Sequence, residues 1–280
     1  MTLDPKKVGQ KTEPHRVRYV DRDVLLYNLA IGAEAERDLP LLYEGFGPKV
    51  VPSFAVILAW PAITELFDIV MGGDLSGIVH GAQSIRLHRP LPPEAEVFTT
   101  GRIDGFYDLK RLAVSVLSTE TRTAGGELLA ETEWEVVHLT EGGFGGEKPP
   151  KKPRPPKPDA APLFEVEVET RPEQALLYRL TGDRNPLHAD PEFAKKVGFD
   201  RPILHGLCTF GIVARVLTRE LAGNEPSKLR ALRGQFVKPV FPGETLVVRA
   251  HRIDEGIRVE AEVEERGEIV FGFGLAELEG

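Results

Sequence analysis

Two side chains with complementary proton chemistry stand close together in residues 178–191, which read YRLTGDRNPLHADP. Asp183 supplies a carboxylate and His188 an imidazole. Such a pair can activate a water molecule if a loop holds both groups within hydrogen-bond reach of it. Gly182 is placed to end a helix, and the prolines that follow stiffen the chain. The segment therefore predicts a rigid loop suited to general acid–base catalysis, with the polar Asn185 between the pair.

A second segment, residues 198–207, reads GFDRPILHGL and leads into an apolar stretch long enough for a buried helix. Gly206 falls where that helix is expected to begin. A glycine there leaves its backbone N–H accessible, at the positive end of the helix dipole. Such an N–H is suited to stabilise a thioester carbonyl oxygen as it gains enolate character.

Each of these residues also has a simpler interpretation. Asp183 alone could be a turn residue, because an aspartate shortly before Asn-Pro is common turn chemistry. His188 alone could be a surface or supporting histidine, and His205 could belong to an ordinary loop. Cys208 is expected to be a small core residue rather than a nucleophile. A zinc site is not expected, because no Cys/His spacing fits one, and no phosphate loop or dinucleotide fingerprint is present.

The elements that must position these residues occur twice along the chain. Residues 85–97 read IRLHRPLPPEAEV and residues 234–246 read GQFVKPVFPGETL, and each segment runs on into Arg-Ile-Asp. Residues 27–29 and 178–180 also match, as Tyr-x-Leu. The matches keep nearly the same offset and the same order, which indicates a duplicated unit.

Each unit is predicted to combine a long helix with an antiparallel sheet. Residues 164–169 alternate between apolar and acidic side chains, as in a half-buried strand, and residues 171–180 have helical spacing. The stretch 207–221 predicts a buried helix. The strand-like segments that follow it are residues 245–253, 257–264 and 268–278. The expected fold class is α+β, with a curved sheet wrapped around one helix in each unit and the two sheets paired edge to edge.

A linker is expected between the two units. Residues 142–162 begin with glycines around Phe144 and continue with closely spaced lysines and prolines, which cannot build a helix or a central strand. We therefore expect an N-terminal unit of residues 1–141 and a C-terminal unit of residues 163–280. A solvated tether is favoured over a polyanion-binding tail, because no aromatic residue interleaves the basic run.

The composition narrows the class of protein. The 280 residues are 41% hydrophobic and 28% charged, which fits two globular domains. A formal net charge of −8 argues against nucleic-acid binding but allows an anionic ligand held by local cations. The single cysteine fits a reducing compartment. With no export signal and no apolar run of about 18 residues, a cytoplasmic protein away from membranes is expected.

Residues 178–191 and 198–207 together resemble the signature of the MaoC-like, (R)-specific 2-enoyl-CoA hydratases, also called hydratase 2. Through residues 27–33, 41–44 and 52–54, the first half is similar to the N-terminal half of double hotdog members of that family. The resemblance implies two hotdog folds in tandem and association into a homodimer. It implies reversible addition of water to a trans-2-enoyl-CoA, giving (3R)-3-hydroxyacyl-CoA, in fatty-acid or sterol side-chain metabolism and without a metal or redox cofactor.

The resemblance also assigns roles to residues of this chain. Asp183 and His188 correspond to the pair that holds the catalytic water. Asn185 corresponds to the residue that orients this assembly, and Gly206 to the glycine whose N–H meets the thioester oxygen. Lys110 would meet a CoA phosphate. All the residues assigned to substrate and CoA binding are His80, Gly81, Lys110, Arg184, Pro186, Leu187 and Phe236.

The two units differ at the position that matters for catalysis. Gly182-Asp183 aligns with Gly32-Ala33, so the first half has alanine in place of the carboxylate, and no equivalent of His188 follows. We therefore expect one active site per chain, in the second half, with the first half binding the acyl group. The alternatives are a hotdog thioesterase, a dehydratase acting on acyl carrier protein, or a non-catalytic acyl-CoA-binding subunit of a larger complex.

Overall fold

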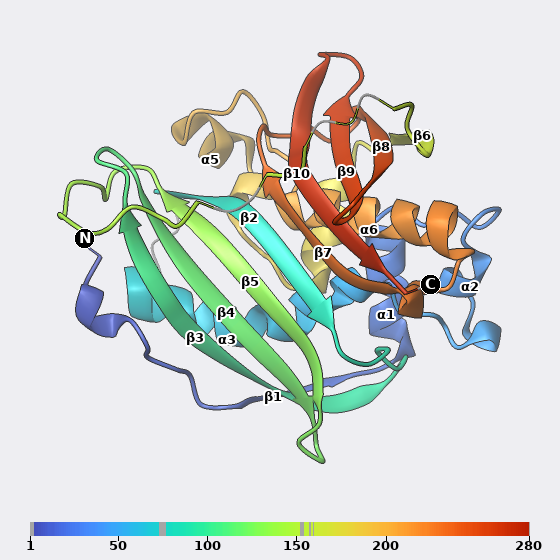
Figure 1. Ribbon diagram of the computed structural model, residues 1–280, viewed down its shortest axis with the longest axis horizontal. Helices are drawn as coiled ribbons and strands as arrows, with labels where there is room; N and C mark the ends of the chain where they lie inside the picture. The colour runs from blue at the N-terminus through green and yellow to red at the C-terminus, as the bar shows by residue number, and fades with distance from the viewer. Residues whose placement is uncertain (1–2, 73–76, 152–153, 157, 159, 280) are drawn as a thin grey trace.

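One antiparallel sheet runs through the computed structural model, which describes residues 3–72, 77–151, 154–156, 158 and 160–279 (Figure 1). Its strands are β1 (His15–Tyr19), β2 (Ile78–Leu87), β3 (Ala95–Asp108), β4 (Ala113–Thr123), β5 (Leu128–His138), β6 (Phe164–Glu169), β7 (Leu229–Phe236), β8 (Thr245–Ile253), β9 (Gly256–Val263) and β10 (Glu268–Leu278). Their order across the sheet is β1-β3-β4-β5-β2-β7-β10-β9-β8-β6. The halves of the chain join where β2 pairs antiparallel with β7. This pairing confirms the predicted α+β class and the edge-to-edge association of two sheets.

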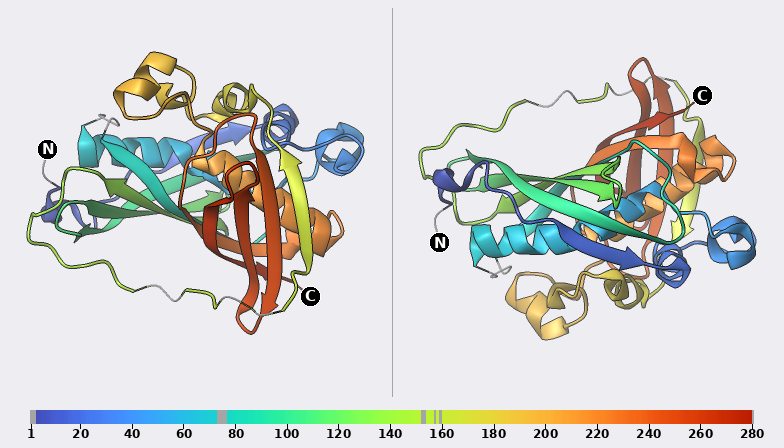
Figure 2. Two further views of the ribbon diagram at one scale, coloured as in Figure 1. Left: turned by 90° about the horizontal axis from the view of Figure 1, so that it is seen from above. Right: turned by 90° about the horizontal axis from the view of Figure 1, so that it is seen from below.

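Each half of the sheet curves around one long helix. In the first half, α3 (Ala55–Met71) packs on β3, β4 and β5, and in the second half α6 (Gly206–Ala222) packs on β7, β8 and β10 (Figures 1 and 2). Shorter helices precede the two long ones. These are α1 (Asp21–Ala30), α2 (Leu39–Leu42), α4 (Gln174–Tyr178) and α5 (Pro191–Lys196). The order of elements is thus repeated, and the protein is a double hotdog.

The helix α3 is more regular than its sequence predicts. Pro61 lies inside it, although a proline in the interior of a helix removes a backbone hydrogen bond and usually kinks or breaks the helix. With the preceding turn the helix spans Pro52–Met71, which is long and apolar enough to cross a membrane by length and composition alone. Most of this span is buried within the fold, and it includes Phe54 and Leu66 of the hydrophobic core. A core helix of the first half accounts for this apolar run, which is longer than we expected.

Two elements of the second half differ from the sequence prediction. The expected helix over residues 171–180 is only one turn and a half long, because α4 passes into a 3-10 turn at Arg179–Thr181. Strand β7 was missed, since its sequence, LRALRGQF, lacks clear two-residue alternation. Gly234 in this strand lies directly beneath the ring of Phe271, where a Cβ would approach the ring to about 2.1 Å. Gly234 interrupts the apolar pattern of the strand because the ring of Phe271 occupies the space that its side chain would need. A glycine in a central strand is often found where another group approaches the backbone this closely.

The linker is attached to the rest of the molecule by several contacts and passes around its outside (Figure 2). The backbone N–H groups of Gly143 and Gly145 donate to the carboxylate of Asp108. The guanidinium carbon of Arg154 lies 4.4 Å from the ring centroid of Phe273. The described part of the linker contains no helix or strand. Its residues outside the described part are Lys152, Pro153, Lys157 and Asp159.

A buried ion pair joins the two halves of the chain. Arg215 of α6 lies 2.6 Å from the carboxylate of Asp38, and both side chains are fully buried. The Nε–H of Arg215 also donates to the backbone oxygen of Ile31, at 3.1 Å. A Cβ at Gly32 would lie 3.6 Å from the same guanidinium. The first-half loop that aligns with Gly182-Asp183 is therefore packed against a side chain from α6.

Candidate active site

Local hydrogen bonds fix the loop that carries the predicted catalytic residues. The carboxylate of Asp183 accepts the backbone N–H of Asn185, at 3.0 Å. The side-chain oxygen of Asn185 in turn accepts the backbone N–H of Leu187, also at 3.0 Å, and so caps the next turn. Gly182 has a φ of 151° and lies against the ring of Trp60 of α3, where a Cβ would sit 3.3 Å from the indole. Both halves of the protein therefore position this loop.

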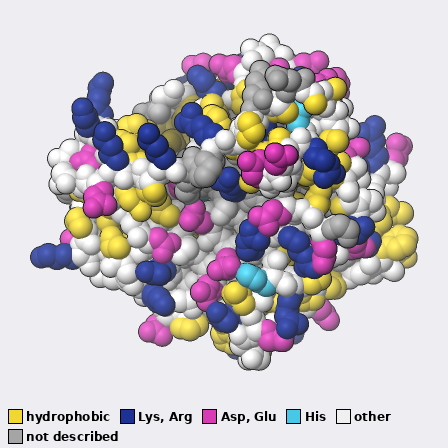
Figure 3. All heavy atoms as spheres, in the orientation of Figure 1, with side chains coloured by type: hydrophobic (Ala, Val, Ile, Leu, Met, Phe, Trp, Pro, Cys, Tyr) yellow, Lys and Arg dark blue, Asp and Glu magenta, His cyan; other side chains and the backbone are white. Residues whose placement is uncertain are grey.

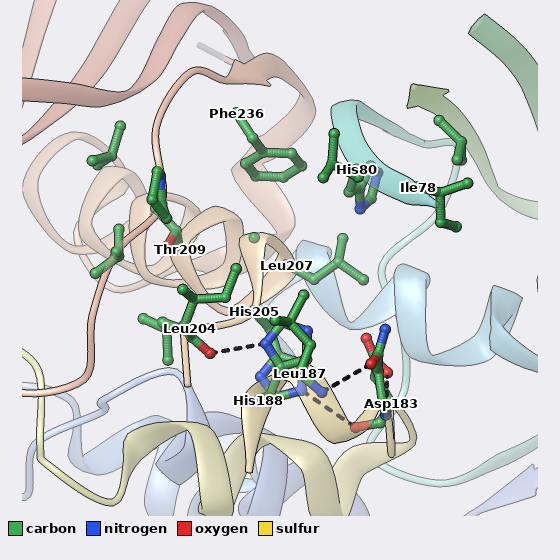
Figure 4. A pocket seen from close by; sticks show the side chains of 18 of the residues that line it. Ile78, His80, Asp183, Leu187, His188, Leu204, His205, Leu207, Thr209 and Phe236 are labelled. Carbon is green, nitrogen blue, oxygen red and sulfur yellow. Dashed lines mark hydrogen bonds between the residues drawn. The ribbon is translucent and has the colours of Figure 1, made fainter. Parts of the chain in front are cut away.

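The side chains of Asp183, His188 and His205 meet at one end of a cavity (Figure 4). One polar atom from each lies within 4.8 Å of the others. The Nδ1–H of His188 donates to the backbone oxygen of Ile203 at 2.8 Å, which leaves Nε2 as an acceptor. Within the described structure, Asp183 and His188 share no direct hydrogen bond. Their separation suits one water molecule that hydrogen-bonds to both.

Burial shifts the pKa values of Asp183 and His188 in opposite directions. Desolvation raises the pKa of Asp183, against the opposing charge of His188 and the N–H of Asn185. Desolvation lowers the pKa of His188, and Asp183 opposes that shift. Burial thus disfavours both the doubly protonated cation and the fully deprotonated anion. The two groups therefore titrate as a coupled pair, in which burial favours the neutral form of each.

We expect this arrangement to give a bell-shaped dependence of kcat/KM on pH. A proton taken up as the pH falls would occupy the acceptor on His188. Loss of the carboxyl proton as the pH rises would remove the donor on Asp183. Because burial lowers the pKa of His188, the acid limb should lie below pH 6.5, the ordinary value for histidine. Initial rates on an enoyl-CoA across the pH range would measure this, and an acid limb above 6.5 would contradict it.

Gly206, whose N–H is predicted to stabilise the thioester oxygen, lies at the start of α6. Gly206 is the first residue of this 17-residue helix, so its N–H points away from the helical hydrogen-bond ladder. The ring of Phe236 packs directly on Gly206, where a Cβ would be 3.2 Å from the ring. His80 contacts the same ring edge-on at 4.9 Å and stacks on Trp134 at 5.1 Å. A Cβ at this position would make a tight contact, and the ring of Phe236 would have to shift by a few tenths of an ångström.

The cavity has a volume of about 320 Å³ and is mostly apolar, which is the character of small-molecule sites. It lies between the halves of the chain, with Trp60, Phe67 and Trp134 from the first half. It brings together most of the residues predicted from the sequence. These are His80, Asp183, Asn185, Leu187, His188, Gly206 and Phe236.

Four predicted binding residues do not line the described cavity. Gly81 sits at the bulge of β2, next to His80. Lys110 lies in the turn between β3 and β4 with a left-handed backbone, φ 71°. Arg184 and Pro186 are exposed on the catalytic loop. Their roles in CoA binding stay predictions.

His205 is a member of the site that sequence reasoning missed. Its position immediately before the helix-starting glycine was the available signal. A carboxylate and two imidazoles are also a donor set for metals. However, the rings of His188 and His205 are stacked, with centroids 3.6 Å apart and planes at 26°. Ring lone pairs lie in the ring planes, so stacked imidazoles do not converge on one ion. The donor set therefore does not fit a metal centre.

A tandem hotdog with an acid–base pair facing a helix N-terminus defines a class of acyl-thioester hydro-lyases. Residues 17–139 match a family model described as MFE-2 hydratase 2 N-terminal domain, and residues 154–270 match the MaoC like domain. The chain belongs to the MaoC-like hydratase 2 family, in its double hotdog form.

Relatives of known name agree with this assignment. The chain is 38% identical to 3-hydroxyacyl-thioester dehydratase Y of Mycobacterium tuberculosis, over 91% of this chain and 90% of that protein. It is 36% identical to the peroxisomal enoyl-CoA hydratase 2 of Arabidopsis thaliana, over 98% of this chain and 94% of that protein. A solved MaoC-like dehydratase from Phytophthora capsici superposes with a TM-score of 0.88 at 29% identity, covering 99% of this chain and 98% of the other.

Proposed function

We propose that this protein reversibly hydrates trans-2-enoyl-CoA thioesters to (3R)-3-hydroxyacyl-CoA. One observation carries the proposal: polar atoms of Asp183 and His188 lie within 4.8 Å of each other in an apolar cavity that is also lined by Gly206, the first residue of α6. The names of the relatives supply the substrate class, since they are an enoyl-CoA hydratase and a 3-hydroxyacyl-thioester dehydratase. Fatty-acid or sterol side-chain metabolism is the setting that we propose.

We propose that the two catalytic residues divide the proton transfers between them. Nε2 of His188 takes a proton from the bound water as the water oxygen bonds to C3. The π electrons of the C2=C3 bond shift toward the thioester, whose oxygen is stabilised by the N–H of Gly206. Asp183, acting as a carboxylic acid, then gives its proton to C2. Transfer of the proton from His188 to Asp183 restores the pair for the next turnover.

We propose that the first half provides the acyl-binding wall and has no second active site. Ala33 stands where the carboxylate would be, and it is buried. The loop around it contacts Arg215, whose partner is Asp38. The aromatic residues that the first half contributes to the cavity, including Trp60, support its role in binding.

The remaining features of the proposal concern cofactors, partners and location. Hydration adds only the elements of water to the substrate. In the proposed mechanism, His188 and Asp183 carry out the two proton transfers without a cofactor. The net charge of −8 supports the expectation of no nucleic-acid partner. On the face in Figure 3, basic side chains are interspersed with acidic ones. A homodimer, no membrane contact and a cytoplasmic location are also proposed, although the Arabidopsis relative is named as peroxisomal.

The alternatives are separable with the purified chain alone. We expect loss of the conjugated enoyl absorbance with crotonyl-CoA, without release of free thiol. A thioesterase would release CoA, and a dehydratase specific for acyl carrier protein would act on crotonyl-carrier protein only. A non-catalytic subunit would bind acyl-CoA without turnover. Any of these three outcomes would contradict the proposal.

A further inference from the structure

His205 connects the three parts of the candidate site, although its sequence position assigned it no role. It precedes Gly206 directly, is 1% exposed, and lines the cavity. Its backbone oxygen accepts the N–H groups of Cys208 and Thr209, at 3.0 and 3.2 Å. The residue is therefore held by the first turn of α6, which is among the most buried elements of the protein.

The side chain of His205 reaches from this fixed position to the catalytic loop (Figure 4). Its ring stacks on that of His188, with centroids 3.6 Å apart. Its Nε2–H donates to the backbone oxygen of Asp183, at 3.3 Å. A carbonyl oxygen only accepts, so the proton of the neutral ring lies on Nε2. The ring of Tyr178, 4.9 Å away, packs against His205 as well.

We propose that His205 is a positioning residue, which fixes the Asp183–His188 pair relative to the N–H of Gly206. The inference rests on the proposed hydratase function. Each contact serves one member of the pair: the hydrogen bond holds the backbone of Asp183, and the stacked ring sets the plane of His188. The positions of Asp183 and of His188 are then both fixed relative to α6, whose first N–H stabilises the thioester oxygen. Rigid support of this kind decides whether reacting groups keep a productive geometry.

A direct proton-transfer role fits His205 less well than positioning. Its protonated nitrogen is directed at a backbone carbonyl of the loop. Its Nδ1 is buried and has no hydrogen-bond partner in the described part of the chain. The proposed acid–base pair, Asp183 and His188, is complete without it. The ring therefore acts through its two neighbours.

The hydrogen bond can be tested with two amide variants of similar polarity. In His205→Gln, the side-chain NH₂ overlays Nε2 and can still donate to the oxygen of Asp183. In His205→Asn, the NH₂ overlays Nδ1 and falls short of that oxygen. We expect His205→Asn to lower kcat for crotonyl-CoA about 100-fold, the effect of a misplacement near 1 Å, with little change in KM. His205→Gln should recover about tenfold of that loss.

His138 offers a matched control for the loss of a buried histidine. It is 2% exposed, and its Nε2 is hydrogen-bonded to Ser115 at 2.9 Å, in the sheet of the first half. His138→Asn should lower the thermal midpoint while leaving kcat close to that of the unmodified protein. A kcat loss in this control as large as that in His205→Asn would overturn the inference, because any buried histidine would then have the same effect.

The outcomes distinguish this inference from the proposed function. If the unmodified protein does not hydrate crotonyl-CoA, the proposed function fails. If it does, equal kcat values for His205→Gln and His205→Asn overturn the positioning role alone. A rise in KM with kcat unchanged would also overturn it, since His205 would then act in binding. A kcat for His205→Gln well above that of His205→Asn, at similar KM, supports it.

Discussion

Replacement of Asp183 by asparagine should lower kcat for enoyl-CoA hydration roughly 1,000-fold, and His188→Gln should do the same. The amide of asparagine cannot supply an acidic proton to C2, and glutamine cannot accept one from water. Both variants are close in size to the residue they replace, so the cavity should keep its shape. Initial rates with crotonyl-CoA, together with thermal unfolding of each variant, measure this effect.

Asp190→Asn is the matched control for this experiment. Asp190 lies in the same signature segment but is exposed, and its carboxylate caps α5 by accepting the N–H groups of Glu192 and Phe193. Asparagine is an equally good N-cap residue, so both stability and kcat should stay close to their original values. Full activity of Asp183→Asn, or an equal loss in Asp190→Asn, would rule out the assigned roles.

The second large effect is expected on stability rather than on activity. Asp38→Asn removes the counter-charge of Arg215, which stays buried between the two halves. Burial already lowers the pKa of this guanidinium, with Asp38 opposing the shift, but an arginine remains charged near neutral pH. Breaking a buried pair by removing one partner costs about 3–5 kcal/mol. We therefore expect a large fall in the unfolding midpoint, measured in urea or by heat.

A surface pair provides the comparison for Asp38→Asn. Lys195 and Glu192 are in contact at 3.1 Å, yet their side chains are 59% and 83% exposed. Lys195→Ala should therefore change the free energy of unfolding by less than about 1 kcal/mol. If Asp38→Asn were no more destabilising than Lys195→Ala, the buried pair would not be what holds the first-half loop against α6.

Local patterns in the sequence were sufficient for much of the fold and the centre of the site. The segment 178–191 predicted the catalytic loop, because its turn residues and its acid–base pair are neighbours in the chain. The repeat predicted two units, and alternation predicted β8 and β10 with the bounds that the structure shows. Gly206 was correctly placed at the start of the buried helix. Each of these features is marked by a pattern of residue types close together in the sequence.

Features that depend on distant contacts could not be predicted from the sequence. The pairing of Arg215 with Asp38 joins two residues from different halves, and nothing periodic links them. Trp60 reaches the catalytic loop only because the two halves pack together. His205 looked like ordinary loop chemistry, since its stacking on His188 requires the loop and α6 to meet. The sequence around each of these residues therefore does not reveal its contacts in the folded protein.

The duplication also changes how the catalytic pair is interpreted. Asp183 could have been a turn residue, and it does accept the N–H of Asn185. The matching loop of the first half forms with Ala33 in that place, so the turn alone does not require a carboxylate. Desolvation raises the pKa of the Asp183 carboxyl group, which means that its ionised form is destabilised in the folded protein. A role in acid–base catalysis would explain why a carboxyl group is placed there.

The most direct test of the central claim is the stereochemistry of the product that the purified protein forms from crotonyl-CoA and water. Chiral chromatography of the hydroxyacyl product would measure it, with Asp183→Asn run in parallel. The account predicts (3R)-3-hydroxybutyryl-CoA from the unmodified protein and only background product from the variant. A (3S) or racemic product, or the same yield from Asp183→Asn, would contradict it.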